Sequence, residues 1–250
     1  MTFPVSFQIG SISLSAHTIF DLLSLFIAYR FFLYQKSRIH RAVPLNPKAE
    51  WGILIGGATG AVIGSRLIGS LENPELFFLV TSWQYYFYTK TIVGGIAGGI
   101  LGVEAAKKLV GVTKRTGDIF VKPLMLAIII GRIGCLLTGV QDGTVGFEST
   151  LPWAFDQGDG INRHPTSLYE IIFLVLLWRY ISNRHKLLAL VSGHQFRVFI
   201  VAYFSFRILV DFIKPSLPLI LNLSSIQLCA LSFVFYYLWQ LHQSSKTSPH

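Results

Sequence analysis

Residues that could do chemistry gather between Gly131 and Glu170. The segment begins with Gly-Arg-Ile-Gly-Cys at 131–135 and ends with His-Pro-Thr-Ser-Leu-Tyr-Glu at 164–170. Both motifs reach into apolar segments, where a charged or titratable side chain is costly and marks a functional site by default. Arg132 could bind a phosphate through two parallel hydrogen bonds, and a histidine such as His164 could exchange a proton near neutral pH. The pattern predicts an anion site with a proton-transfer group at its mouth.

Further charged residues fall inside apolar segments, among them Arg207, Asp211 and Arg66. Arg207 and Asp211 are one helical turn apart and would share a helix face, whereas Arg66 lies nearer the outer end of its segment. A rise of about 1.5 Å per residue places Arg132 and Arg207 deep in the apolar layer. Deep arginines facing acidic partners would make a cationic cavity open to the outside, and a phospholipid phosphate is the anion available there.

Simpler readings of these residues stay open. Arg66 could extend its charge to the membrane surface, and Arg207 with Asp211 could be an ion pair that only makes burial tolerable. His164 could be a hydrogen-bonding residue at the interface. The glycines that follow Arg132 could let the backbone approach a ligand or could belong to a flexible loop.

The composition favours an integral membrane protein. Of 250 residues, 52% are hydrophobic, 13% are charged and 20 are phenylalanine, which is too apolar for an ordinary soluble domain. The net charge of +9 comes from short basic clusters between apolar runs, so nucleic-acid binding is not expected. Cys135 and Cys229 lie in separate apolar segments, which suggests neither a disulfide framework nor a metal site.

The apolar segments predict an all-α protein with about seven transmembrane helices in a single membrane domain, residues 1–250. Each span needs about 20 apolar residues. The loops after the first, third and fifth spans hold most lysines and arginines, so the N-terminus is expected outside and the C-terminus in the cytoplasm. Glycines in the second and third spans favour close helix packing. The predicted spans are 17–35, 51–71, 91–110, 123–139, a fifth that begins at Pro165, 196–213 and 224–241.

These motifs together resemble the bacterial prolipoprotein diacylglyceryl transferases. Gly-Arg-Ile-Gly at 131–134, with Gly139 and Gly143, is similar to that family's signature, and 164–170 is similar to its His-Pro-Ser/Thr-Gln-Leu-Tyr-Glu motif. Residues 207–212 resemble a third family motif, and 64–66 a Gly-x-Arg motif on the second span. The resemblance covers most of the chain, and seven spans with an outer N-terminus agree with it.

The resemblance implies a reaction in the bacterial cytoplasmic membrane. Family members move the diacylglyceryl group of phosphatidylglycerol onto a cysteine thiol in the signal peptide region of a lipoprotein precursor, and neither a metal nor a soluble cofactor is implied. The catalytic residues would be Arg132, Arg207, His164 and Tyr169. The substrate-binding residues would be Arg66, Gly134, Cys135, Gly139, Gly143, Glu170 and Asp211.

The chain departs from the family pattern at four positions. Cys135 replaces an asparagine, Val140 a glutamate and Ser167 a glutamine, and Val93 stands where a histidine is usual. An alternative is therefore a divergent relative that binds phosphatidylglycerol or uses a different acceptor. A small transporter lined by intramembrane charges is a third possibility, but the sequence contains no inverted repeat that would support it.

Overall fold

The computed structural model describes residues 3–9, 12–38, 46–79, 85–86, 89–184 and 192–246. The chain forms two compact units. The first comprises residues 1–42, 116–199 and 213–215, and the second comprises 43–115, 200–212 and 216–250.

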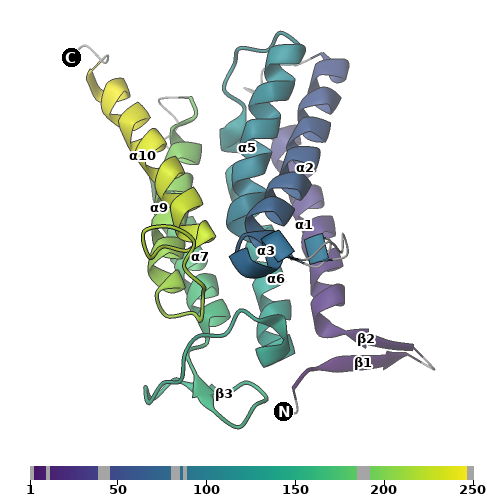
Figure 1. The fold of residues 1–250 in the computed structure, drawn as a ribbon. Coiled ribbons are helices and arrows are strands. Elements are labelled where there is room, and N and C mark those ends of the chain that lie inside the picture. The colour runs from purple at the N-terminus through teal and green to yellow at the C-terminus, as the bar shows by residue number, and fades with distance from the viewer. Residues whose placement is uncertain are drawn as a thin grey trace. The chain divides into compact units, whose positions relative to one another are not determined.

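Helices dominate the described chain (Figure 1). A long helix occupies each of the seven predicted apolar segments, with bounds within a few residues of those predicted. Pro165 is a correction, because it precedes the fifth helix and is not its first residue. The long helices are α1 (Ala16–Arg38), α2 (Pro47–Ser70), α5 (Ile92–Leu109), α6 (Val121–Thr138), α7 (Thr166–Asn183), α9 (His194–Asp211) and α10 (Ser225–Lys246).

Three stretches among the described residues are long and apolar enough to cross a membrane: Ala16–Ser37, Pro47–Ser70 and Gly117–Asp142. The protein is therefore a largely helical membrane protein. Of the other long helices, α9 carries three charged residues, Arg197, Arg207 and Asp211. Parts of two predicted basic loops, 39–45 and 185–191, lie outside the described residues. Seven crossings and the orientation of the termini stay predictions.

The first unit begins with a β-hairpin that the all-α prediction missed. Strands β1 (Ser6–Ile9) and β2 (Ile12–Ser15) pair antiparallel, with Ser6 opposite Ser15. A second short pair, β3 (Phe155–Asp156) and β4 (Asn162–Arg163), lies in the loop before α7. The β1–β2 hairpin leads directly into α1 (Figure 1). It therefore fixes the start of α1, where His17 lies.

Helix α6 packs against α1 on one side and α7 on another, all within the first unit. Gly134 makes the α1 contact close, because a Cβ added there would lie 2.8 Å from the Cβ of Phe20 and 3.3 Å from the Cα of His17. A short 3-10 helix, η1 (Gly117–Phe120), precedes α6, and another, η2 (Gly139–Asp142), follows it. The absence of a side chain at Gly134 thus brings the start of α1 against the end of α6.

The second unit is built on the packing of α2 against α5. A Cβ added at Gly60 would lie 2.3 Å from the carbonyl oxygen of Gly98, and one added at Gly64 would lie 2.4 Å from that of Gly94. The helices approach until their backbones touch, which confirms the prediction made from the glycines of these segments. The unit also holds the short helix α3 (Pro74–Leu79), and α10 packs against both α2 and α5.

Candidate functional site

The centre of the candidate site is a buried ion pair between α6 and α7 in the first unit. The Nε of Arg132 lies 2.9 Å from Oε2 of Glu170. The two side chains are 5% and 1% exposed. A charge this deeply buried needs a partner, and the prediction that a deep arginine faces an acidic residue is confirmed here. The pair fixes the orientation of a planar group that can bind phosphate.

Cys135 lies one helical turn after Arg132, and the two side chains touch. Nη1 of Arg132 donates a hydrogen bond to the Cys135 sulfur over 3.7 Å. The arginine thus contacts Glu170 through one nitrogen and Cys135 through another.

His164 and Tyr169 form a second pair in this unit. Nδ1 of His164 and the hydroxyl of Tyr169 are 3.1 Å apart, and Nε1 of Trp153 donates to the same hydroxyl over 2.8 Å. The backbone of His164 is fixed as well, since its carbonyl accepts from the amide of Gly146 over 3.0 Å. The two predicted titratable residues are therefore in contact, in a geometry through which a proton can pass.

The turn after α6 is set by two predicted glycines. Gly139 has φ of +70°, and a Cβ there would lie 2.1 Å from the carbonyl oxygen of Gln157. Gly143 has φ of +67° and ends η2 in a left-handed conformation. Glycine adopts such angles without steric cost. The two residues reverse the chain so that Asp142, between them, faces the start of α1.

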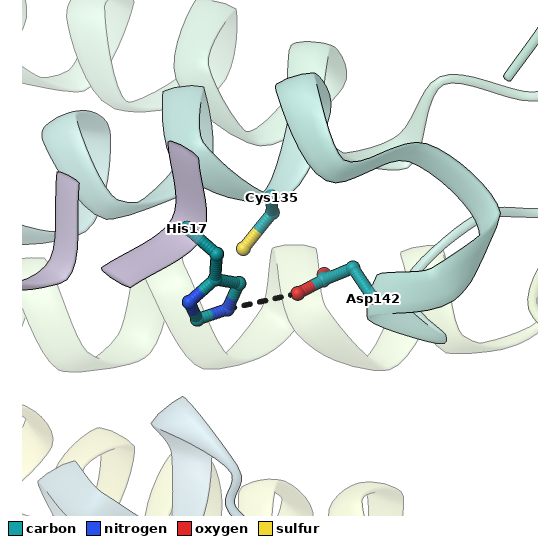
Figure 2. Close-up of side chains that lie close together, drawn as sticks. All are labelled: His17, Cys135 and Asp142. Atoms are coloured by element: carbon teal, nitrogen blue, oxygen red, sulfur yellow. Dashed lines mark ion pairs between the residues drawn. The ribbon is translucent and has the colours of Figure 1, made fainter. Parts of the chain in front are cut away.

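Sequence reasoning missed three residues of this site: His17, Asp21 and Asp142. His17 lies between two carboxylates, with its Nδ1 3.0 Å from Oδ2 of Asp21 and its Nε2 2.9 Å from Oδ1 of Asp142. Figure 2 shows the His17 ring, the Cys135 sulfur and the Asp142 carboxylate turned toward one another. One ligand atom from each lies within 4.8 Å of the others. No metal site was predicted from the sequence, yet His17, Cys135 and Asp142 could hold a metal ion.

One signal for these residues was visible in the sequence. His17 and Asp21 are a helical turn apart near the start of an apolar segment, and such a pair shares one face of a helix. Asp142 gave no signal, because it lies in the turn after α6, far from His17 along the chain. Its carboxylate accepts a hydrogen bond from the Thr144 hydroxyl, which contacts the hydroxyl of Ser167 at 3.3 Å.

The remaining predicted residues lie in the second unit. Nη1 of Arg66 donates to the carbonyl of Thr89 over 3.0 Å, so the arginine fixes the chain before α5. Arg207 and Asp211 are both buried in α9. The carboxylate of Asp211 accepts a hydrogen bond from the Ser224 hydroxyl, just before α10. The structure thus distributes the predicted residues over both units.

Comparison with known proteins gives consistent matches over most of the chain. A family model described as prolipoprotein diacylglyceryl transferase matches residues 4–242. The phosphatidylglycerol–prolipoprotein diacylglyceryl transferase of Bordetella bronchiseptica is 32% identical over 179 residues, which are 65% of this chain and 61% of the relative. The protein of the same name from Paramagnetospirillum magneticum is 28% identical over 226 residues, or 84% and 80%.

Coverage differs among these relatives. For the Bordetella protein, the match spans about three fifths of the relative's length. The transferase of Methylobacillus flagellatus is 31% identical over 264 residues, which cover 95% of each chain. The family model begins before β1 and ends within α10, so it includes every site residue described above. The chain belongs to the prolipoprotein diacylglyceryl transferase family.

Proposed function

We propose that this protein transfers the diacylglyceryl group of phosphatidylglycerol to the cysteine thiol of a lipoprotein precursor. The observation that carries the proposal is the family match over residues 4–242. The names of the relatives give phosphatidylglycerol and a prolipoprotein as the substrates of those proteins. The buried arginine next to a thiol, within the matched region, supports a site for anionic lipid and sulfur chemistry.

The chemistry of the transfer defines what the site must do. The acceptor sulfur forms a bond to the terminal glyceryl carbon, and the bond from that carbon to the phosphate oxygen breaks. Glycerol phosphate leaves with the bonding electrons, and the thiol loses its proton. The protein must therefore orient the phosphate, stabilise the negative charge of the leaving group and accept one proton.

Arg132 is suited to the phosphate role. Glu170 holds its guanidinium in place at 2.9 Å, so the group is oriented before a lipid binds. Preoriented charge stabilises a leaving group without the cost of rearrangement during the reaction. His164 and Tyr169, in contact at 3.1 Å, are proposed to transfer the proton. The turn from Gly139 to Gly143 is proposed to contact the lipid through its backbone.

Residues of the second unit keep their predicted roles as proposals. Burial of Arg207 and Asp211 inside α9 supports a role beyond surface solubility, because buried charges are rare without a function. Arg66 is proposed to assist substrate binding. Its contact with the Thr89 carbonyl equally supports a structural role for it.

We also propose the full membrane arrangement, with seven crossings in one membrane domain, the N-terminus outside and the C-terminus in the cytoplasm. Helices of 18 residues or more in all seven predicted segments support the number of crossings. The basic loops support the orientation through the positive-inside rule. In a bacterium, this arrangement places the loop before α7 on the outer side of the cytoplasmic membrane.

A second candidate function is lipid binding without the standard transfer, or transfer to a different acceptor. Val93 favours it, because this fully buried valine stands where the family resemblance places a histidine. A valine cannot accept the proton of an acceptor thiol. The side chains of Cys135, Val140 and Ser167 also differ from those that the family motifs carry at these positions.

The deciding experiment incubates the purified chain with phosphatidylglycerol and a lipobox peptide and detects the diacylglyceryl adduct by mass spectrometry. A peptide with serine in place of the acceptor cysteine is the matched substrate control. Arg132→Ala should abolish the adduct, whereas Arg163→Ala should retain it, because Arg163 pairs with Asp159 in the loop before α7. An established family member should form the adduct in parallel. If this chain then forms none but retains the lipid through purification, the second candidate function holds.

A further inference from the structure

The cluster around His17 has the composition of a zinc site. It offers one imidazole nitrogen, one thiol sulfur and one carboxylate oxygen, all within 4.8 Å of one another. Zinc binds such ligands at about 2.0–2.3 Å, which places tetrahedral ligand atoms about 3.4 Å apart. The Nε2 of His17 and Oδ1 of Asp142 are now 2.9 Å apart. Movements of about 1 Å in side chains alone would therefore close the cluster around an ion.

The surroundings orient two of the ligands. Nδ1 of His17 lies 3.0 Å from Oδ2 of Asp21, so Nε2 is the nitrogen that faces Asp142. A carboxylate behind a histidine is the usual support of a metal-binding imidazole, since it fixes the ring and makes the other nitrogen more basic. Asp142 is held in turn by the Thr144 hydroxyl through its second oxygen. The ligand atoms are thus aimed at a common point.

Charge balance also favours a dication. A Cys135 sulfur that binds as a thiolate and the carboxylate of Asp142 would together neutralise the two charges of a dication. The Asp21 carboxylate behind His17 adds one further negative charge, and the adjacent Arg132–Glu170 pair is neutral by itself. The sulfur and nitrogen ligands favour zinc over magnesium or calcium, which prefer oxygen.

We propose that His17, Cys135 and Asp142 bind a zinc ion whose fourth position is open to a thiolate ligand. Three protein ligands with one open position are typical of catalytic zinc, whereas structural zinc has four. Among the residues that the structure describes, His17, Cys135 and Asp142 are the potential metal ligands of this cluster. Figure 2 shows them arriving from α1, α6 and η2.

The identity of the fourth ligand rests on the proposed function. An acceptor cysteine that binds zinc would lose its proton, which His164 and Tyr169 are proposed to transfer, because a coordinating thiol is deprotonated outright. The zinc-bound sulfur would then form the bond to the glyceryl carbon as the carbon–oxygen bond to phosphate breaks. The metal would activate the acceptor thiol, a role that Val93 cannot perform because a valine side chain cannot accept a proton.

Metal content tests the site without reference to activity. The full chain is purified in detergent, incubated with zinc chloride, freed of excess metal and analysed by elemental mass spectrometry. We expect about one zinc per chain, reduced at least about tenfold by Cys135→Ser or His17→Ala. Cys229→Ser is the matched control and should retain the metal. An absence of bound zinc, or equal zinc in the Cys135→Ser protein, would overturn the proposal.

A second measurement does not depend on variants that could misfold. In a Cys229→Ser background, Cys135 is the one remaining cysteine of the chain. Zinc should slow its alkylation by iodoacetamide by roughly tenfold or more, and a chelator should restore the rate, because a bound thiolate is protected. The conservative Asp142→Asn change should weaken this protection. An alkylation rate that zinc leaves unchanged would show that Cys135 is not a ligand.

Cobalt substitution tests the fourth position. We expect the absorption of the cobalt-loaded protein to change when a cysteine lipobox peptide is added and to stay unchanged with the serine peptide. A small free thiol is added in a third experiment. If the absorption changes with this thiol and not with the cysteine peptide, the fourth position binds soluble thiols and the assignment to the peptide is overturned. Zinc binding without diacylglyceryl transfer would reject the proposed function and leave the metal site standing. Transfer that is unaffected by complete removal of zinc would reject the role of the metal.

Discussion

The pair of Arg132 and Glu170 makes a quantitative prediction about stability. Glu170 is 1% exposed and Arg132 is 5% exposed, so Glu170→Ala leaves an arginine buried without this carboxylate. Breaking one side of a buried ion pair costs about 3–5 kcal/mol, mostly because the remaining charge stays desolvated. Glu170→Gln should cost less, since its amide oxygen can still accept a hydrogen bond from the guanidinium. Reversible unfolding in mixed micelles with increasing SDS measures both free energies.

An ion pair of equal length with an exposed carboxylate provides the control. Nζ of Lys107 lies 2.9 Å from Oε1 of Glu104; the Lys107 side chain is 7% exposed and the Glu104 side chain is 59% exposed. Glu104→Ala should therefore cost less than Glu170→Ala, because water solvates most of the carboxylate that it removes. Because the two ion pairs have the same length, a difference between them isolates the effect of burial. If Glu170→Ala and Glu104→Ala destabilise the protein equally, the reasoning from burial is wrong.

Three further predictions address packing, pH and capping. Gly134→Ala should destabilise the protein by about 1–3 kcal/mol, because the added methyl group clashes with α1. Gly131→Ala should stabilise it by up to about 1 kcal/mol, because a Cβ there would lie 3.9 Å from its nearest neighbouring atom and alanine favours the helix. Thermal unfolding of the two variants tests this difference. Backbone N–H donors hold the pKa of Asp156 below its ordinary value, so this stabilisation is complete above about pH 4 and is lost as the pH falls through the lowered pKa. The NMR chemical shift of the Gly158 amide should change as Asp156 titrates, and this pH-dependent change should be absent in Asp156→Asn. Asp118→Ala should cost about 1–2 kcal/mol in SDS unfolding, because its carboxylate accepts from two amides at the start of α9; wild-type stability would contradict this capping role.

Much of the fold follows from hydropathy because a membrane imposes a simple rule. Each crossing needs an unbroken apolar helix, so the segments are visible as runs of apolar residues. The glycines of α2 and α5 were equally readable, since close backbone contact requires residues without side chains. The need of a deep arginine for an acidic partner also follows from the cost of burial, and Glu170 meets it for Arg132.

The hairpin and the His17 cluster could not be predicted in the same way. Strands β1 and β2 have four residues each, too few for alternation to identify them against the adjoining apolar helix. The cluster joins residues that are far apart in sequence. It depends on the packing of α1 against α6 at Gly134 and on the reversal of the chain through η2. Neither the helix contact nor the turn has a periodic signature, so the ligands could be recognised only together in space.

Arg132 connects the buried ion pair to the thiol. Its Nε lies 2.9 Å from Glu170, and its Nη1 donates to the Cys135 sulfur over 3.7 Å. Both nitrogens belong to one rigid planar group, so the position of one contact determines the direction of the other. A lysine would keep the charge but has a single ammonium on a flexible stem. Arg132→Lys could therefore balance Glu170 without directing a donor at the sulfur. An arginine is required here for its geometry as well as its charge, because one planar group directs one nitrogen at Glu170 and another at the Cys135 sulfur.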